Sequence, residues 1–218
     1  PRDIRLVNTL FDDLTFGRWG ETRSWAFHIG GVDDLSIRHV TVIDSIDTPD
    51  EPRELLLSLN SISSYRAEIV DSILPLNNYG IRNTCGEGVA ALNVGSSGWF
   101  DLVSGSSCGA SGNPASSPWN VRGNVFPRLR TYPVVGIYPS GNSYPADYSS
   151  VGMVSYNRCR ISYLDDECRA TLSDFALREG SPYRNAASDL TDPGINAELL
   201  AERTRCTLGG DTRSCISV

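Results

Sequence analysis

Lysine and glutamine are absent from this chain of 218 residues, and histidine occurs only as His28 and His39. All 19 basic residues are therefore arginine, a bias that by itself indicates no function. No Cys-x-x-Cys occurs, and with so few histidines a zinc site is poorly supported, so we expect no metal and no cofactor. The chain also lacks a run of about 18 apolar residues, which argues against a membrane span.

Charge and composition are those of a soluble globular protein. The net charge of -7 gives no reason for the whole surface to attract nucleic acid or anionic lipid. Apolar residues make up 40% of the chain, enough for one domain with a sizeable core. The opening stretch PRDIRLVNTL already has a strand pattern and no signal peptide. We therefore expect a mature product, a fragment or a chain that lacks its beginning.

The six cysteines are an even number, which suits a set of disulfides. Their spacing favours three sequential pairs: Cys85–Cys108, Cys159–Cys168 and Cys206–Cys215. Each pair would close a local loop, and together they indicate an oxidising compartment, so we expect a secreted, extracellular or cell-surface protein. The alternatives are another pairing or six reduced thiols in a cytosolic protein.

Four segments of the sequence align without gaps. They are IRLVNTLFDDL, LSIRHVTVIDS, AEIVDSILPLN and WNVRGNVFPRL, which begin at Ile4, Leu35, Ala67 and Trp119. Each has apolar residues at positions one, three and eight, and alternation of this kind predicts a strand. Position five is small or polar and predicts a bend: Asn8, His39, Asp71 and Gly123.

The first three copies start at nearly equal intervals, as the repeats of a solenoid do. A second strand precedes each later copy, in SWAFHIGG, ELLLSLNS and GVAALNVG. In our alignment Trp25 corresponds to Leu55 and Phe27 to Leu57. Strands with no helical period between them argue against a doubly wound α/β sheet. A β-sandwich is the main alternative, but the regular interval favours stacked parallel strands.

This bend-and-strand repeat resembles the right-handed parallel β-helix proteins of the pectate-lyase-like superfamily, and most of all large secreted β-helix proteins of soil bacteria. YGIRNTCGEGVAALN followed by WNVRGNVF is similar to their last full coils. YPSGNSYPADYSSVGMV is similar to the segment after those coils, and LREGSPYRNAASDLTDPGINAELL to their closing segment. The resemblance covers most of the chain, from about residue 4 to residue 203.

The resemblance implies an all-β fold, a right-handed parallel β-helix of about three to four coils with a disulfide-closed C-terminal cap. We expect coils over 1–130, with a loop insertion at 95–118, and the closing segment and cap over 131–218. The chain would then be the C-terminal part of a longer helix. Its first coil would be covered by upstream sequence or by a protein partner, because solenoid ends are normally covered.

The stretch 177–200 has too few apolar residues for a core of its own, so we expect it to complete a larger body. NAELLAERT, residues 196–204, predicts a short helix that Asp192 and Pro193 would start. Leu199 and Leu200 would then face the last coil.

The sequence contains no complete catalytic motif of the related enzymes. The Arg-x-Pro-x-x-Arg of pectate lyases is absent, and so are the Gly-His-Gly and carboxylate triad of β-helix glycosidases. Glu87, at the base of the inserted loop, is the single carboxylate that we single out as a candidate acid or ligand. Catalytic residues are otherwise unknown, and enzymatic activity is left open.

Six polar residues fall at equivalent alternating positions on the outward side of the repeated strands: Arg5, Ser36, Arg38, Glu68, Asn120 and Arg122. We call them the outer stripe. Arginine forks bind carboxylates in bidentate fashion, so Arg5, Arg38 and Arg122 could hold an acidic polysaccharide. Trp99 in the inserted loop could stack on a sugar face. The alternative is an ordinary solvated sheet face.

Two functions are therefore carried forward. The first is an extracellular β-helix protein that binds carbohydrate, or part of a polysaccharide-processing protein whose catalytic region is absent or upstream. The second is a structural or adhesive subunit of an extracellular assembly without catalytic activity.

The disulfide pairing gives the first prediction. Peptide mapping under nonreducing conditions should recover Cys85–Cys108, Cys159–Cys168 and Cys206–Cys215, because sequential pairs close the shortest loops. Six free thiols would contradict both the pairing and the extracellular location.

Overall fold

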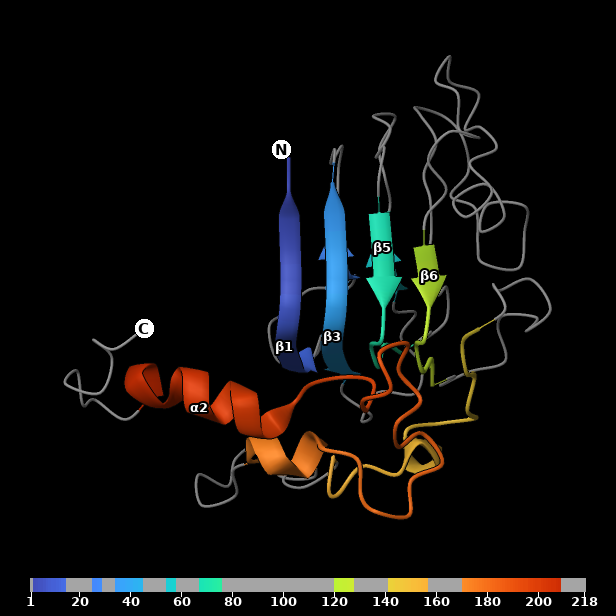
Figure 1. The fold of residues 1–218 in the computed structure, drawn as a ribbon, viewed down its shortest axis with the longest axis vertical. Helices are drawn as coiled ribbons and strands as arrows, with labels where there is room; N and C mark the ends of the chain where they lie inside the picture. The colour runs from blue at the N-terminus through green and yellow to red at the C-terminus, as the bar shows by residue number, and fades with distance from the viewer. Residues whose placement is uncertain are drawn as a thin grey trace.

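In a computed structural model of the protein, the residues described are 2–14, 25–28, 34–44, 54–57, 67–75, 120–127, 141–156 and 170–208. Four strands form a parallel sheet in the order β1-β3-β5-β6 (Figure 1): β1 Ile4–Leu14, β3 Leu35–Asp44, β5 Ala67–Val70 and β6 Asn120–Arg122. Two more strands, β2 Trp25–His28 and β4 Glu54–Leu57, pair with each other in parallel. Within these ranges, the helical elements are two 3-10 helices and one α-helix: η3 Ser149–Val151, η4 Leu172–Phe175 and α2 Ala197–Leu208. No helix in these ranges has the length and apolar character that crossing a membrane requires.

The four-stranded sheet has the register that the repeat predicts. Ile4 pairs with Leu35, Leu35 with Ala67, and Glu68 with Asn120. These pairings place the four aligned segments side by side without a shift in the strands before the bend, so the gapless alignment is confirmed.

The alignment of the second strands is wrong by one residue. Trp25 pairs with Glu54 and not with Leu55, and Phe27 pairs with Leu56. The apolar run in ELLL does not specify which leucine lies opposite an apolar neighbour. Register is weakly specified where the apolar pattern does not alternate.

The chain passes alternately between the two sheets, from β1 to β2, β3, β4 and β5. The sheets meet at Phe11 of β1 and Phe27 of β2, whose ring centroids are 5.1 Å apart in an edge-to-face arrangement. All pairs between the named strands are parallel, whereas a β-sandwich is built of antiparallel ones. The described residues do not close a coil, so the right-handed parallel β-helix stays a prediction.

Each copy of the repeat bends through a residue in the left-handed region. The φ angle is 48° at Asn8, 49° at His39, 54° at Asp71 and 67° at Gly123. Glycine reaches this region freely, and asparagine, aspartate and histidine are the side chains most often found there. The predicted bend at position five is therefore confirmed in all four copies, and the backbone explains the choice of residues.

A fifth copy of the bend, at Gly141, was missed by the alignment. Its φ is 83°, and Ser143 bridges to Val125 in the fourth copy. The Phe126 amide donates to the Ser143 carbonyl over 2.8 Å. In the sequence Pro139 stands at position three of this copy, where the others have an aliphatic residue, and this conceals the repeat.

Side chains just after the bends connect successive copies. The amide of Ser72 donates to Asn124 Oδ1, and the amide of Asn124 donates to Asn142 Oδ1, both over 3.0 Å. The side-chain amides of Asn124 and Asn142 donate in turn to the Ile69 and Val121 carbonyls. Backbone groups that a bend removes from the strand ladder are thus satisfied by the next copy, as buried polar groups must be.

The core has two parts, one on each side of the bends. Before the bends, Ile37, Ile69 and Val121 form a buried column. After the bends, residues of the copies share one cluster with the C-terminal segments: Ile43, Ile73, Val125, Tyr148, Val151, Met153, Phe175, Leu177 and Ile195. Leu177 and Ile195 belong to this cluster, so the expectation that 177–200 completes a larger body is confirmed.

The helix predicted over 196–204 is confirmed, although it extends further: α2 begins at Ala197 and continues to Leu208. The predicted starting signal, Asp192 and Pro193, is not its cap. Asn196 Oδ1 accepts a hydrogen bond from the Leu199 amide over 2.9 Å, which makes Asn196 the capping residue.

The residue ahead of the helix contacts the first copy of the repeat. Asn196 is hydrogen bonded to Asn8, and in Figure 1 the helix lies near the β1 side of the sheet. Leu200 packs against the same cluster as Leu10, and this cluster also includes Val125 of the fourth copy. The prediction that Leu199 and Leu200 face the last coil stays a prediction.

Alanine substitutions at two bend glycines distinguish the cost of backbone strain from the cost of side-chain crowding. Gly141→Ala should cost about 1–2 kcal/mol of unfolding free energy, because a left-handed residue gains a Cβ in open space. Gly123→Ala should cost more, because its Cβ would collide with the Asp71 carboxylate and lie 3.2 Å from the Ser188 nitrogen. Urea denaturation of both variants measures the difference. Equal losses would contradict this assignment of the crowding.

Candidate functional site

The outer stripe is in register across the sheet, as predicted. Arg5 pairs with Ser36, Ser36 with Glu68, and Glu68 with Asn120. Arg38 and Arg122 lie on either side of Val70, which is fully buried. Four residues of the stripe therefore form a continuous row on neighbouring strands, and Val70 separates the other two.

Two of the three arginines in the stripe already bind carboxylates of the chain. Arg38 Nε and Nη2 donate to the two oxygens of Glu68 over 2.8 and 3.2 Å, and Ser36 Oγ donates to Glu68 Oε1 over 2.6 Å. The hydrogen bond from Arg38 is the main reason that the pKa of Glu68 is lowered. Arg5 Nε donates to Asp3 over 2.7 Å. A carboxylate ligand would have to displace these partners.

Arg122 is exposed, and within the ranges the structure describes no ion pair involves its guanidinium. It is thus the arginine of the stripe best placed to meet a ligand. Glu87 and Trp99 lie outside the described residues, as do all cysteines except Cys206, which lies in α2. The disulfide pairs, the candidate acid and the aromatic loop stay predictions.

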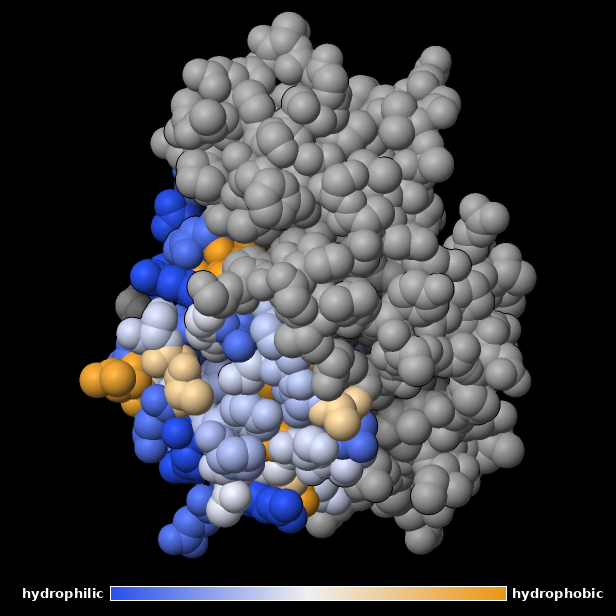
Figure 2. Space-filling view, turned by 90° about the vertical axis from the view of Figure 1, so that its right-hand side faces the viewer, coloured by the Kyte–Doolittle hydropathy of each residue, from blue (hydrophilic) through white to orange (hydrophobic). Residues whose placement is uncertain are grey.

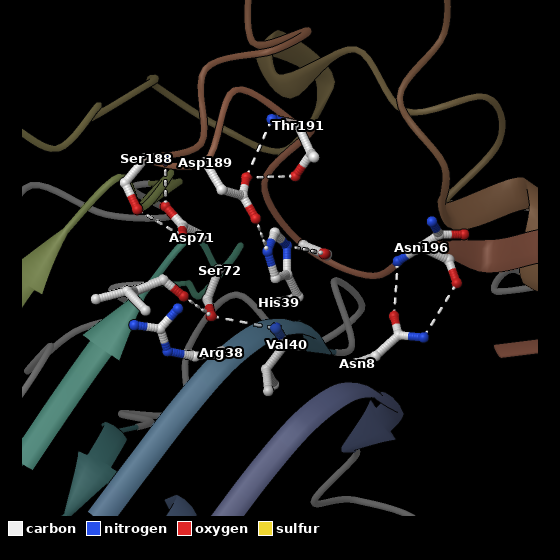
Figure 3. A network of polar contacts seen from close by, with 12 residues as sticks. Asn8, Arg38, His39, Val40, Asp71, Ser72, Ser188, Asp189, Thr191 and Asn196 are labelled. Carbon is white, nitrogen blue, oxygen red and sulfur yellow. Dashed lines mark hydrogen bonds and ion pairs between the residues drawn. The ribbon is translucent and has the colours of Figure 1, made fainter. Parts of the chain in front are cut away.

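A second polar site lies along the bends. Residues 187–196, which we call the strap, cross the row of bends, and Figure 3 shows their contacts. Asp71 is fully buried, and its two carboxylate oxygens accept from the Ser188 amide over 2.6 Å and the Ser188 hydroxyl over 2.8 Å. The Gly194 amide donates to the Asp71 carbonyl over 2.8 Å. Asp71 therefore binds both ends of the strap.

His39 occupies the centre of the same site. Its Nε2 lies 3.0 Å from Asp189 Oδ2, and its Nδ1 lies 3.2 Å from the Gly194 carbonyl oxygen. Figure 3 shows the ring between these two partners, with Asp71 on the neighbouring bend. The sequence predicts a bend at His39, and these contacts add a charged partner from the strap to that structural position.

The strap makes further contacts with the second copy, at Thr41, and with the first copy, at Asn8. The Ile195 amide donates to Thr41 Oγ1 over 3.0 Å. The Asn196 amide donates to Asn8 Oδ1 over 2.7 Å, and Asn8 Nδ2 donates back to the Asn196 carbonyl over 3.3 Å. The strap is thus bound to three neighbouring bend residues, each through a different polar group.

The arrangement is not that of a hydrolase triad. In such a triad the serine hydroxyl donates to the histidine, whereas Ser188 Oγ donates to Asp71. Ligand atoms of His39, Asp71 and Asp189 do lie within 4.8 Å of one another, a grouping that could hold a metal ion. Both Asp71 oxygens and both His39 nitrogens are engaged with the chain, so a metal would have to compete with these hydrogen bonds.

Asp189 is strongly biased toward its ionised form. The Thr191 hydroxyl and amide donate to Asp189 Oδ1 over 2.6 and 3.0 Å. Led by the hydroxyl, these bonds and His39 lower the pKa of Asp189 to about 2, although burial opposes the shift. A negative charge is therefore held beside the His39 ring across the whole physiological range.

This second site was not found from the sequence. The stacking of position five could have shown that Asn8, His39 and Asp71 become neighbours. Their partners Ser188 and Asp189 lie more than a hundred residues further along the chain, with no motif to link them to the bends.

Comparisons of the chain with protein-family models, with curated proteins and with solved structures found no match.

The lowered pKa of Asp189 predicts how the stability of the protein changes in acid. A carboxyl group with a lowered pKa contributes stability that is present above its unfolded pKa of about 3.9 and is lost as the pH falls toward its folded value of about 2. Thr191→Val should raise the pKa of Asp189 and reduce the stability lost between these pH values. Carboxyl NMR titration and urea denaturation from pH 5 to pH 2 measure both effects.

Thr9→Val is the matched control, because the Thr9 hydroxyl donates to the Val7 carbonyl instead. An Asp189 titration that is the same in wild type and Thr191→Val would contradict the assigned cause.

Proposed function

We propose that this chain belongs to an extracellular parallel β-helix protein with a structural or adhesive role, in which the open edge of β1 pairs with a strand of the same repeat from another chain. The observation that supports this proposal most is that β1 lies at the edge of the described sheet with partly exposed apolar side chains. The cysteine content and the resemblance of the repeat support the extracellular location.

β1 is an edge strand with partly exposed apolar side chains. In the described sheet it has one neighbour, β3. Ile4 and Leu6 are partly exposed, whereas their equivalents Leu35 and Ile37 are 1% and 0% exposed. Val7 on the outward face is 52% exposed. Full burial of such a side chain contributes up to roughly 1.5–3 kcal/mol, so a covering strand would be favourable.

The backbone of β1 favours a parallel strand as the occupant of this edge. The Ile4 amide donates to the Asp34 carbonyl on the β3 side, over 2.8 Å. Amides alternate in direction along a strand, so those of Arg5 and Val7 point toward the open edge. A strand with apolar residues at positions one and three would repeat the β1–β3 pairing and cover Ile4 and Leu6.

On the side of the molecule opposite β1, the described residues form no comparable apolar surface. Figure 2 shows that side, where the described residues are largely hydrophilic and the hydrophobic ones are scattered. Broad contiguous apolar surfaces are what usually mark docking faces. The edge of β1 is thus the better candidate for assembly.

Binding of an acidic polysaccharide is the second candidate. Exposed Arg122, beside the ion-paired Arg38–Glu68 in the outer stripe, supports it. The engagement of Arg5 and Arg38 with carboxylates of the chain weighs against it. Neither the outer stripe nor the polar site along the bends adds support for catalytic activity.

The assembly proposal predicts concentration-dependent association of the chain through β1. Val7→Pro should weaken it, because proline removes the amide that faces the open edge while leaving the β3 side bonded. Light scattering against concentration measures the association, and Val7→Thr, which keeps the amide, is the matched control.

The assembly proposal would be contradicted if the wild type, Val7→Pro and Val7→Thr were all thermally stable monomers at every concentration tested. If that monomer also bound an acidic polysaccharide and lost the binding on Arg122→Ala, the second candidate would replace it.

A further inference from the structure

Three side chains present metal-ligating atoms to one point between two bends and the strap. They are His39, Asp71 and Asp189, and their ligand atoms all lie within 4.8 Å of one another. Figure 3 shows His39 and Asp189 facing each other, with Asp71 on the neighbouring bend. One imidazole nitrogen and two carboxylate oxygens form a ligand set that divalent first-row metal ions, zinc among them, accept.

The Gly194 carbonyl decides which nitrogen of the His39 ring carries the proton. A carbonyl oxygen only accepts, so Nδ1, which lies 3.2 Å from it, is the donor. In the neutral ring the lone pair is then on Nε2, which lies 3.0 Å from Asp189 Oδ2. A lone pair and a carboxylate oxygen repel each other unless a proton or a metal ion lies between them. Metal-binding histidines have this arrangement, with one ring N–H donated to a carbonyl or carboxylate and the other nitrogen directed at the ion.

Asp71 gives a second and independent indication of a cation. Its side chain is fully buried, and the two donors that it accepts from, the amide and the hydroxyl of Ser188, are uncharged. Among the described residues no ion pair involves Asp71. Buried charges are normally paired with an opposite charge or coordinate a metal ion. Each carboxylate oxygen accepts more than one bond, so Asp71 can bind an ion and keep Ser188.

Asp189 is held ready as the third ligand. The Thr191 amide and hydroxyl both donate to Oδ1, which leaves Oδ2 directed at His39. These bonds keep the pKa of Asp189 at about 2, so the carboxyl group is ionised, as a metal ligand must be. The side chain is 47% exposed and has room to move toward the separations of about 3–4 Å that ligand atoms have around a zinc ion.

We propose that His39, Asp71 and Asp189 bind a divalent metal ion of the zinc class, which clamps the strap to the bends of the second and third copies. The ion would replace a single contact, the one between His39 and Asp189. The proposal does not depend on the assembly of β1 or on a glycan.

Each of the three ligands already has an outer partner in the strap. Such partners orient metal ligands and contribute to metal affinity. They are the Gly194 carbonyl for His39, Ser188 for Asp71 and Thr191 for Asp189. The strap therefore supplies one ligand and the support for all three.

Titration of zinc chloride into the chain by isothermal calorimetry tests the proposal, after any free thiols have been alkylated so that cysteines do not bind the metal. One zinc ion should bind per chain. Calcium chloride should bind at least about tenfold more weakly, because calcium takes oxygen ligands and gains little from an imidazole. Zinc should also raise the midpoint of thermal unfolding, since an ion that binds the folded chain stabilises it.

Imidazole ¹⁵N shifts locate the ion directly. Zinc should shift His39 Nε2 while Nδ1 keeps its proton, because Nδ1 is the donor to Gly194. This measurement needs only the wild-type chain, so it decides the case even where a variant does not fold.

Two substitutions remove one ligand each. His39→Asn keeps a residue type that the equivalent bend has at Asn8, and Asp189→Asn changes a partly exposed side chain. Each should weaken zinc binding by at least about tenfold, since changes to outer partners alone cost 10–100-fold. His28→Asn is the matched control, because it removes the other histidine of the chain and should leave zinc binding unchanged.

Three outcomes would overturn the proposal. The first is a wild-type chain that binds no zinc. The second is zinc binding that leaves the His39 Nε2 shift unchanged or that is as tight in His39→Asn and Asp189→Asn as in the wild type, which would place the ion elsewhere. The third is calcium bound as tightly as zinc, which would exclude the imidazole from the ligand set.

Discussion

The left-handed bend at position five is the constraint on which the rest of the described structure depends. Each copy bends at a single residue, and only glycine or a side chain tolerant of positive φ can do so at low cost. The chain meets this with Asn8, His39, Asp71 and the glycines Gly123 and Gly141. Parallel pairing in register then brings these residues together on one edge of the core. A local backbone requirement thus creates a row of polar groups.

That polar row explains why a segment distant in sequence can close the core. The strap contributes Ile195 to the apolar cluster, but apolar burial alone would not fix its position along the sheet. Directional bonds from Asp71 and Asn8 do so, because each accepts or donates at two atoms. The cost of burying Asp71 is offset by the two donors of Ser188, as a buried carboxylate requires. Apolar contacts therefore supply the driving force and the bends supply the register.

The sequence allowed the register of the main sheet to be predicted, because apolar positions and a polar bend recur together in every copy. It did not allow the register of β2 and β4 to be predicted, since the run of leucines in β4 has no polar residue to mark its phase. The fifth copy was hidden by Pro139 at position three. The strap contacts were out of reach for a different reason. Ser188 and Asp189 have no local pattern, and the contacts with Asp71 and His39 exist only once the copies have stacked.

One backbone position thus carries different chemistry in different copies without a change of fold. At Asn8 it forms a reciprocal amide pair, at Asp71 it accepts two donors, and at His39 it contacts two residues of the strap through the two ring nitrogens. Glycine at Gly123 has no side chain, and the space that a Cβ would fill is taken by the Asp71 carboxylate. The backbone asks only for tolerance of positive φ, so asparagine, histidine and aspartate occupy the first three bends on the same backbone, whereas Gly123 has no room for a side chain. The side chain at each bend then decides which group of the strap is bound there.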